Sequence, residues 1–249
     1  MTYHSIDDLL ARMTADLMRL TEAGDARRFF HATYLRTTQA VADEIARGGF
    51  TDADWVRRWD LAFASLYLDA LDADRRGEPV SGPWRVAFDT AKRQPDLPPL
   101  RHVLFGINAH INYDLPQALV EVIGPEDFDD PAVMRRREAD HERVDGVLRA
   151  RVGAEDAELG AVSRVTIIDR LMRPANQAAS RRFLGEARAK VWRNAIALDH
   201  ARRVGPARYA TVLAELETLC AERVRDLTAR GPVLLTLARR GFGVLVSDA

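Results

Sequence analysis

Side chains able to carry acid–base or metal chemistry are threaded through the otherwise apolar stretch of residues 100–119. His102, His110 and Asp114 are separated by multiples of four residues, so they lie along one slowly drifting stripe if this stretch is helical. A buried polar group left without a hydrogen-bond partner costs about 1–3 kcal/mol. These side chains are therefore expected to form a shared polar network.

The same stretch indicates where its helix lies in the protein. Asn108 and Asn112 form a second polar stripe, and apolar residues fill the positions between the two stripes. Because no solvated face remains, this helix is expected to run through the middle of a bundle. Gly106 costs about 1 kcal/mol relative to alanine in mid-helix, which suggests that another backbone or a ligand approaches closely there. Pro116 is expected to kink or restart the helix, since it removes one intrahelical hydrogen bond.

The spacing of His110 and Asp114 offers a nitrogen and an oxygen ligand to a metal ion from one helix face. A second cluster, Asp140, His141 and Asp145, lies on another predicted helix, and bundle cores can bring two such helices together. Under this hypothesis His110, Asp114 and His141 bind a divalent metal, with zinc the expected ion. The alternative is that Asp114 only fixes the tautomer of His110 within a structural network.

Other residues are candidates for catalysis or substrate binding. A metal-bound water is a nucleophile near neutral pH, and Asp60 or Asp140 would orient or deprotonate it. Asp60 stands between aromatic residues, where a carboxylate must find a partner or titrate upward. His102 belongs to the same predicted catalytic pocket, and Tyr34 fits either this pocket or the core. The residues predicted to bind substrate are His31, Tyr34, Tyr67, Asn108 and Asn112.

The central motif also carries a resemblance to a known family. The run HVLFGINAHINYDLP, residues 102–116, followed by DHERVD at residues 140–145, resembles the family named domain of unknown function 5995 (DUF5995). That family has an NAHINxDLP core and a downstream DHxxVN, so Asp145 stands where the family has asparagine, which puts its role as a ligand in doubt. The resemblance covers most of the chain and implies no activity. The residues that fall on motif positions are His102, Asn108, His110, Asn112, Asp114, Asp140 and His141.

A shorter likeness is to the zinc-dependent phospholipase C and single-strand nuclease group. These all-helical enzymes are similar in using an HxxxD pair on a core helix, here His110 and Asp114. Their remaining ligand pattern is not evident in this sequence, so this likeness is an analogy of fold and chemistry only.

Composition excludes several classes of function. The 36 basic and 37 acidic residues nearly cancel, so no overall field attracts nucleic acid or an anionic membrane. Residues 1–19 contain no uninterrupted apolar segment of signal-peptide type and no run of about 18 apolar residues occurs, so we expect neither secretion nor a membrane span. The single cysteine, Cys220, cannot form a disulfide within the chain and fits a reducing compartment. We therefore expect a cytoplasmic monomer or homodimer that acts on a small-molecule substrate.

Helical periodicity runs through nearly the whole sequence, and no segment alternates convincingly with period two. The sequence predicts an all-α fold, a single multi-helix bundle of about 8–10 helices in one domain over residues 1–249, with residues 100–119 as its buried central helix. In the second half, breaks at glycine and proline predict helices at 131–152, 155–172 and 174–203.

Three functions stay open at this point. The first is a metal-dependent ester or phosphoester hydrolase built on the two His/Asp clusters. The second is a metal-free pocket whose histidine and aspartate groups transfer protons on, or bind, a hydrophobic metabolite. The third is an interaction protein whose polar network is structural.

Overall fold

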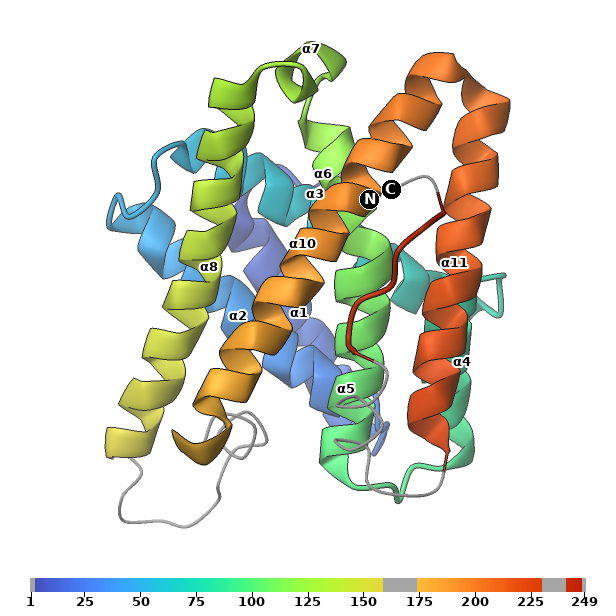
Figure 1. Ribbon diagram of the computed structural model, residues 1–249. Helices are drawn as coiled ribbons and strands as arrows, with labels where there is room; N and C mark the ends of the chain where they lie inside the picture. The colour runs from blue at the N-terminus through green and yellow to red at the C-terminus, as the bar shows by residue number, and fades with distance from the viewer. Residues whose placement is uncertain (1–2, 159–173, 230–240, 248–249) are drawn as a thin grey trace.

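The structure, a computed structural model, describes residues 3–158, 174–229 and 241–247, without the side chains of residue 145 and residues 148–185. All regular elements in these ranges are helices, which confirms the all-α prediction (Figure 1). The elements are α1 (Ile6–Glu22), α2 (Arg28–Ala46), α3 (Ala53–Arg76), α4 (Gly82–Arg93), α5 (Pro99–Ala109), the π-helical turn η1 (His110–Asp114), α6 (Leu115–Val122), α7 (Pro125–Phe128), α8 (Pro131–Glu158), α10 (Pro174–Val204) and α11 (Pro206–Thr228).

Local sequence accounts for several helix ends. Ser5 accepts a hydrogen bond from the backbone N–H of Asp8 at the start of α1, and Asp52 accepts one from that of Trp55 at the start of α3. The α3 helix ends at Gly77, whose φ of 72° is the left-handed conformation that glycine favours. Helices α5, α7, α8, α10 and α11 each begin with a proline, whose missing N–H costs nothing in the first turn.

The segment α5–η1–α6 forms a column through the middle of the bundle (Figure 1). Helices α2, α3, α4, α10 and α11 all contact it. Most of its apolar side chains are buried, including those of Val103, Phe105 and Leu119, and the others are largely partly buried against the core. The expected buried central helix is therefore present, with a π-helical turn inside it.

The stretch 100–119 is interrupted at η1, between α5 and α6, close to the Pro116 that was expected to kink or restart the helix. One predicted helix boundary was wrong. The predicted break near residue 153 is absent, since α8 continues to Glu158. The rest of the helix predicted at 155–172 lies outside the described residues.

The C-terminal segment, residues 241–247, runs without regular structure between α10 and α11 (Figure 1). The Asn194 side chain donates to the Val244 carbonyl at 3.0 Å and accepts from the Val246 N–H at 3.1 Å. From the central column, Asn112 donates to the Phe242 carbonyl at 3.0 Å. Side-chain amides thus replace the backbone partners that an irregular buried segment lacks.

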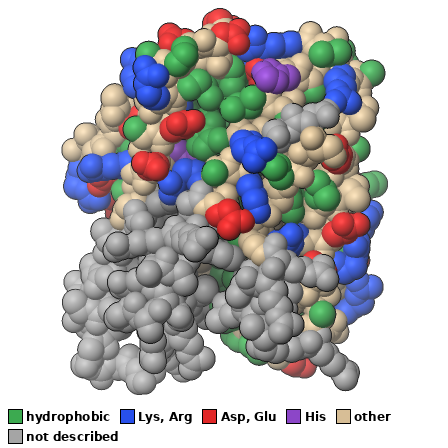
Figure 2. Space-filling model, viewed as in Figure 1, with side chains coloured by type: hydrophobic (Ala, Val, Ile, Leu, Met, Phe, Trp, Pro, Cys, Tyr) green, Lys and Arg blue, Asp and Glu red, His purple; other side chains and the backbone are tan. Residues whose placement is uncertain are grey.

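The surface has no dominant sign of charge on the face seen in Figure 2, where basic and acidic side chains are interspersed. This distribution agrees with the near-zero net charge of the sequence. None of the helices that the structure describes has both the length and the apolar content needed to cross a membrane.

Candidate active site

The π-helical turn η1 places the central histidine and aspartate. In η1 the backbone N–H of Leu115 donates to the carbonyl of His110, one residue further back than in an α-helix. The turn ends two residues before Pro116, which has no N–H and whose ring disfavours a regular α-turn at this point. Single π-helical turns are frequent at functional sites. The predicted restart of the helix at the polar cluster takes this form.

His110 and Asp114 form a buried hydrogen-bonded pair. His110 Nδ1 lies 2.8 Å from Asp114 Oδ2, and the indole Nε1 of Trp84 donates to the same oxygen at 2.8 Å. Because this oxygen accepts from the indole, we assign the imidazole proton to Nδ1, which makes Nε2 the basic nitrogen. All three residues are buried, with exposed fractions of 1–2%.

Burial and the hydrogen bond act in opposite directions on this pair. Burial lowers the pKa of His110, and the bond to Asp114 partly opposes this shift. Burial raises the pKa of Asp114, and the bonds from His110 and Trp84 oppose that shift. We assign the pair as a neutral imidazole beside a carboxylate that accepts from two N–H donors.

Aromatic rings enclose the His110 imidazole. Phe63 stacks on it with ring centroids 3.6 Å apart and an interplanar angle of 4°, and Tyr34 meets it edge-on at 4.5 Å. Phe30 and Tyr67 lie further away, at 6.0 and 5.9 Å. The buried Nε2 has no hydrogen-bond partner among the described residues. A basic nitrogen without a partner in such surroundings requires an explanation.

Two further unpartnered polar groups accompany His110. Oδ2 of Asp60 is buried without a partner, and burial raises the pKa of Asp60 to about 7. The Tyr34 hydroxyl is also buried without a partner in the described part of the chain. Burial raises the pKa of Tyr34, the charges of Asp60 and Asp114 raise it further, and the neighbouring Thr38 side chain opposes these shifts without making a hydrogen bond of acceptable geometry to the hydroxyl.

His141 is buried in a different aromatic setting. Its ring contacts Trp59 at 5.1 Å and Trp192 at 5.7 Å between centroids, and its Nδ1 has no partner among the described residues. Burial lowers its pKa to about 3, with a smaller contribution from Arg188. His110 and His141 are connected through successive ring contacts: His110 stacks on Phe63, Phe63 contacts Trp59, and Trp59 contacts His141.

The three predicted metal ligands are not assembled in the part of the chain that the structure describes. There, no group of three histidine, cysteine, aspartate or glutamate side chains is arranged to hold a metal ion. His110 and Asp114 are paired as expected, but their facing atoms already bond each other. The metal site with His141 therefore stays a prediction from sequence, and the Asp145 side chain lies outside the described residues.

The carboxylate of Asp140 is used in a structural contact between two helical segments. Its two oxygens accept hydrogen bonds from the backbone N–H groups of Thr51 and Asp52, at 2.8 and 2.9 Å. It thus fastens α8 to the segment that begins α3. The predicted role of Asp140 as a base finds no support in this geometry, because both oxygens are occupied.

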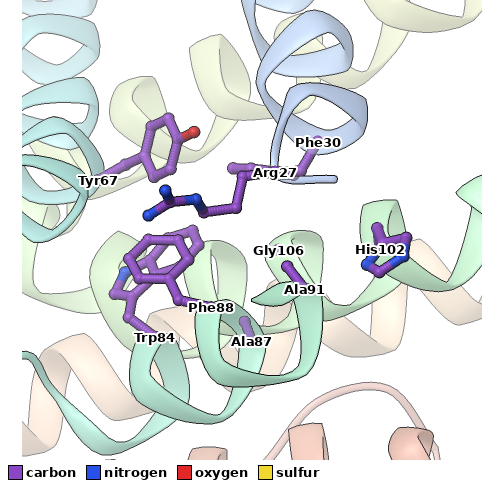
Figure 3. A pocket seen from close by; sticks show the side chains of 9 residues that line it. All are labelled: Arg27, Phe30, Tyr67, Trp84, Ala87, Phe88, Ala91, His102 and Gly106. Carbon is purple, nitrogen blue, oxygen red and sulfur yellow. The ribbon is translucent and has the colours of Figure 1, made fainter. Parts of the chain in front are cut away.

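His102 lies away from the pair, at a small cavity of about 20 Å³, which holds about one water molecule (Figure 3). Figure 3 shows His102 at one end of the cavity and Tyr67, Trp84 and Phe88 at the other, with the Arg27 guanidinium between the ring of Tyr67 and those of Trp84 and Phe88. Burial lowers the pKa of His102, and the nearby Pro95 carbonyl opposes the shift. His102 therefore does not join His110, although both follow the same stripe.

Gly106 lines the same cavity, and its missing side chain makes room for the Phe30 ring rather than for another backbone or a ligand. A Cβ at this position would lie 2.2 Å from Cγ of Phe30. The sequence thus predicted the contact correctly but not its partner.

Two of the residues predicted to bind substrate, His31 and Tyr67, bond each other. His31 Nδ1 lies 2.9 Å from the Tyr67 hydroxyl, and its Nε2 lies 2.8 Å from the Met13 carbonyl. Both ring nitrogens are occupied, so His31 has no nitrogen left for a ligand.

The asparagine stripe is likewise bonded internally. Asn112 donates to Asn108 Oδ1 and to the Phe242 carbonyl, each at 3.0 Å, and Asn108 donates to the Leu104 carbonyl at 3.3 Å. Of the five predicted substrate-binding residues, all of which the structure describes, Tyr34 alone has a buried polar atom without a partner.

Sequence reasoning missed the tryptophans as polar groups. Trp84, which was not among the predicted site residues, is the second donor to Asp114. The available signal was chemical, since a buried indole N–H needs an acceptor. Sequence spacing alone gave no indication that α4 brings this donor to η1.

Comparisons with known proteins give a family but no activity. The family model described as a family of unknown function (DUF5995) matches residues 6–230. The chain belongs to this family. The match contains the whole DUF5995 motif, and it confirms the resemblance noted on His102–Pro116. No curated protein and no solved structure matches the chain. The likeness to the zinc-dependent phospholipase C and nuclease group is therefore not supported.

Proposed function

We propose that this DUF5995 protein is an enzyme that transfers protons on a small organic molecule, with His110 as general base and Asp60 as general acid. One observation carries the proposal: Nε2 of His110, Oδ2 of Asp60 and the hydroxyl of Tyr34 are all buried without partners among the described residues, around one aromatic enclosure. Each such atom costs about 1–3 kcal/mol. A ligand that bonds to them removes this cost.

The His110–Asp114 pair has the features of a general base. Asp114 holds the Nδ1 proton and thereby leaves the Nε2 lone pair directed away from the bond. When Nε2 accepts a proton, the carboxylate stabilises the imidazolium that forms. A positioned base of this kind contributes roughly 10²–10⁴-fold to a rate.

Asp60 supplies the complementary acid. Its pKa of about 7 keeps a substantial fraction protonated at neutral pH, whereas an ordinary aspartate is fully ionised. Where the environment pushes the pKa values of two neighbouring groups in different directions, one group can serve as the acid and the other as the base. The Tyr34 hydroxyl, whose pKa is raised, stays protonated and can donate to a developing oxyanion.

The two alternative functions make different claims. A zinc-dependent ester or phosphoester hydrolase needs further ligands beside His110 Nε2, and a structural network needs no ligand at all. One equivalent of zinc in purified protein, lost in both His110→Gln and His141→Gln, would support the hydrolase and contradict the metal-free base. Our proposal expects full activity after chelation.

Solvent-exchange NMR tests the proposal with a panel of candidate compounds. Protein in D₂O is incubated with small ketones, aldehydes and carboxylic acids, and enzyme-dependent loss of a C–H signal identifies proton abstraction. We expect at least one compound to exchange with wild-type protein and to exchange at least 100-fold more slowly with His110→Gln. His200→Gln, on the surface of α10, is the matched control. Equal exchange rates for His110→Gln and wild type overturn the proposal.

A further inference from the structure

Unpartnered hydrogen-bond donors also gather around His141, outside the acid–base pair. The indole Nε1 atoms of Trp59 and Trp192 and the Nδ1 of His141 are buried and have no hydrogen-bond partner among the described residues. These residues come from α3, α10 and α8, and only 4%, 5% and 6% of their surfaces are exposed. Both indoles contact the His141 ring directly. Three helices thus bring into contact three rings that each carry an unsatisfied nitrogen.

The unsatisfied atoms of this cluster are mainly hydrogen-bond donors. An indole N–H donates and never accepts, so two of the three nitrogens can be satisfied only by an acceptor. The charge that acts on the pKa of His141 is the Arg188 guanidinium, which lowers it. Arg188 itself pairs with Glu142 at 2.9 Å near the surface. Within the described side chains, the three unsatisfied nitrogens therefore have no acceptor, and the cation beside them is paired with a carboxylate.

We propose that Trp59, His141 and Trp192 form a subsite for the carboxylate of a small organic anion. A carboxylate offers two oxygens with about four acceptor positions, which matches two indole donors and one imidazole. The surrounding rings favour an anion with an apolar body, which an organic carboxylate has and inorganic phosphate lacks.

The subsite is separate from the proposed acid–base pair and does not depend on it. Phe63 stacks on His110, Trp59 follows Phe63 at 6.4 Å, and His141 follows Trp59. On the face seen in Figure 2, hydrophobic side chains surface in a strip between the upper parts of α8 and α10, the helices that carry His141 and Trp192. An apolar carboxylate therefore meets a surface of matching character between these helices.

Indole NMR with benzoate as the probe tests the subsite. We expect benzoate to move the indole N–H signals of Trp59 and Trp192 downfield, as a charged acceptor does, and to leave that of Trp84 in place. Trp192→Phe, which keeps a ring and removes the N–H, and His141→Gln should each weaken benzoate binding at least tenfold. Trp55→Phe is the matched control: its indole N–H is also unpartnered among the described residues and its ring stacks on Trp59, but Trp55 contacts Arg137 rather than His141.

Two other probes define the ligand class. Benzamide has the same ring without the charge and should bind at least tenfold more weakly than benzoate, and inorganic phosphate should not compete. Preference for phosphate, or benzoate binding that is unchanged in Trp192→Phe and His141→Gln, overturns the proposal. If a variant fails to fold, absence of benzoate-induced shifts at the wild-type Trp59 and Trp192 signals overturns it equally.

The outcome is separable from that of the proposed function. His110→Gln should lose proton exchange and keep benzoate binding, because it leaves all three subsite nitrogens in place. If benzoate does not bind at Trp59 and Trp192 but proton exchange occurs, only the subsite proposal is overturned. If benzoate binds there but no compound exchanges, only the acid–base proposal is overturned.

Discussion

The central column carries two stripes of buried polar side chains, which differ in whether their hydrogen-bonding atoms have partners. In the asparagine stripe, Asn108 and Asn112 bond each other, their own helix and the Phe242 carbonyl. In the other stripe, His110 and Asp114 bond each other and Trp84 but leave Nε2 of His110 without a partner among the described residues. Both stripes are polar and almost fully buried. What distinguishes a candidate site from a scaffold is the atom left unsatisfied.

The largest effect is expected from Asp60, whose Oδ2, like Nε2 of His110, is buried without a hydrogen-bond partner among the described residues. It should appear in how the free energy of unfolding depends on pH. Its pKa of about 7 in the folded protein exceeds the ordinary value of 3.8, so the folded state keeps a proton that the unfolded chain has lost. Asp60 therefore reduces the free energy of unfolding as pH rises through this interval, by up to about 1.4 kcal/mol per pH unit. Urea denaturation of Asp60→Asn across this range should lack that decline. Parallel curves for variant and wild type would contradict the assignment.

A somewhat smaller effect is expected in the asparagine stripe. Asn112→Ala removes two hydrogen bonds, one of them to the Phe242 carbonyl, and leaves a cavity, so we expect a loss of about 2–4 kcal/mol in the free energy of unfolding. Chemical denaturation measures it, with the exposed His200→Ala as control. Proton exchange should persist in the folded fraction, and selective loss of exchange without destabilisation would assign Asn112 to the site instead.

Overpacking beside the column gives the third effect. Gly106→Ala places a methyl group 2.2 Å from Cγ of Phe30, and we expect about 1–3 kcal/mol of destabilisation from the displaced ring. Thermal unfolding of Gly106→Ala alone and with Phe30→Leu measures the coupling. The smaller side chain should restore part of the stability, whereas additive losses would show that the contact is not the cause.

The smallest effect on stability is expected from Asp114→Asn. The carboxamide oxygen can still accept from His110 and Trp84 while no charge is buried, so the free energy of unfolding should change by about 1 kcal/mol or less. Since Asp114 raises the pKa of His110, its loss should lower that pKa further. NMR titration of the imidazole measures the shift, and an upward shift would contradict the ionised carboxylate.

The sequence predicted those features that depend on local spacing. The central column follows from the absence of a solvated face in residues 100–119, and the His110–Asp114 bond from their separation of four residues. The sequence could not predict contacts made by helices distant in the chain. Trp84 reaches Asp114 from α4, and Asp140 reaches the start of α3 from α8. Both depend on how helices pack, which local periodicity does not encode.

The bond from Asn112 to Phe242 joins residues 130 positions apart and so ties the centre of the bundle to a very late part of the chain. Closing so long a loop costs entropy before any contact compensates for it, which makes such pairings slow to form. Docking of the C-terminal segment is then a late event in refolding. Substitutions that weaken it should accelerate unfolding and leave the refolding rate nearly unchanged.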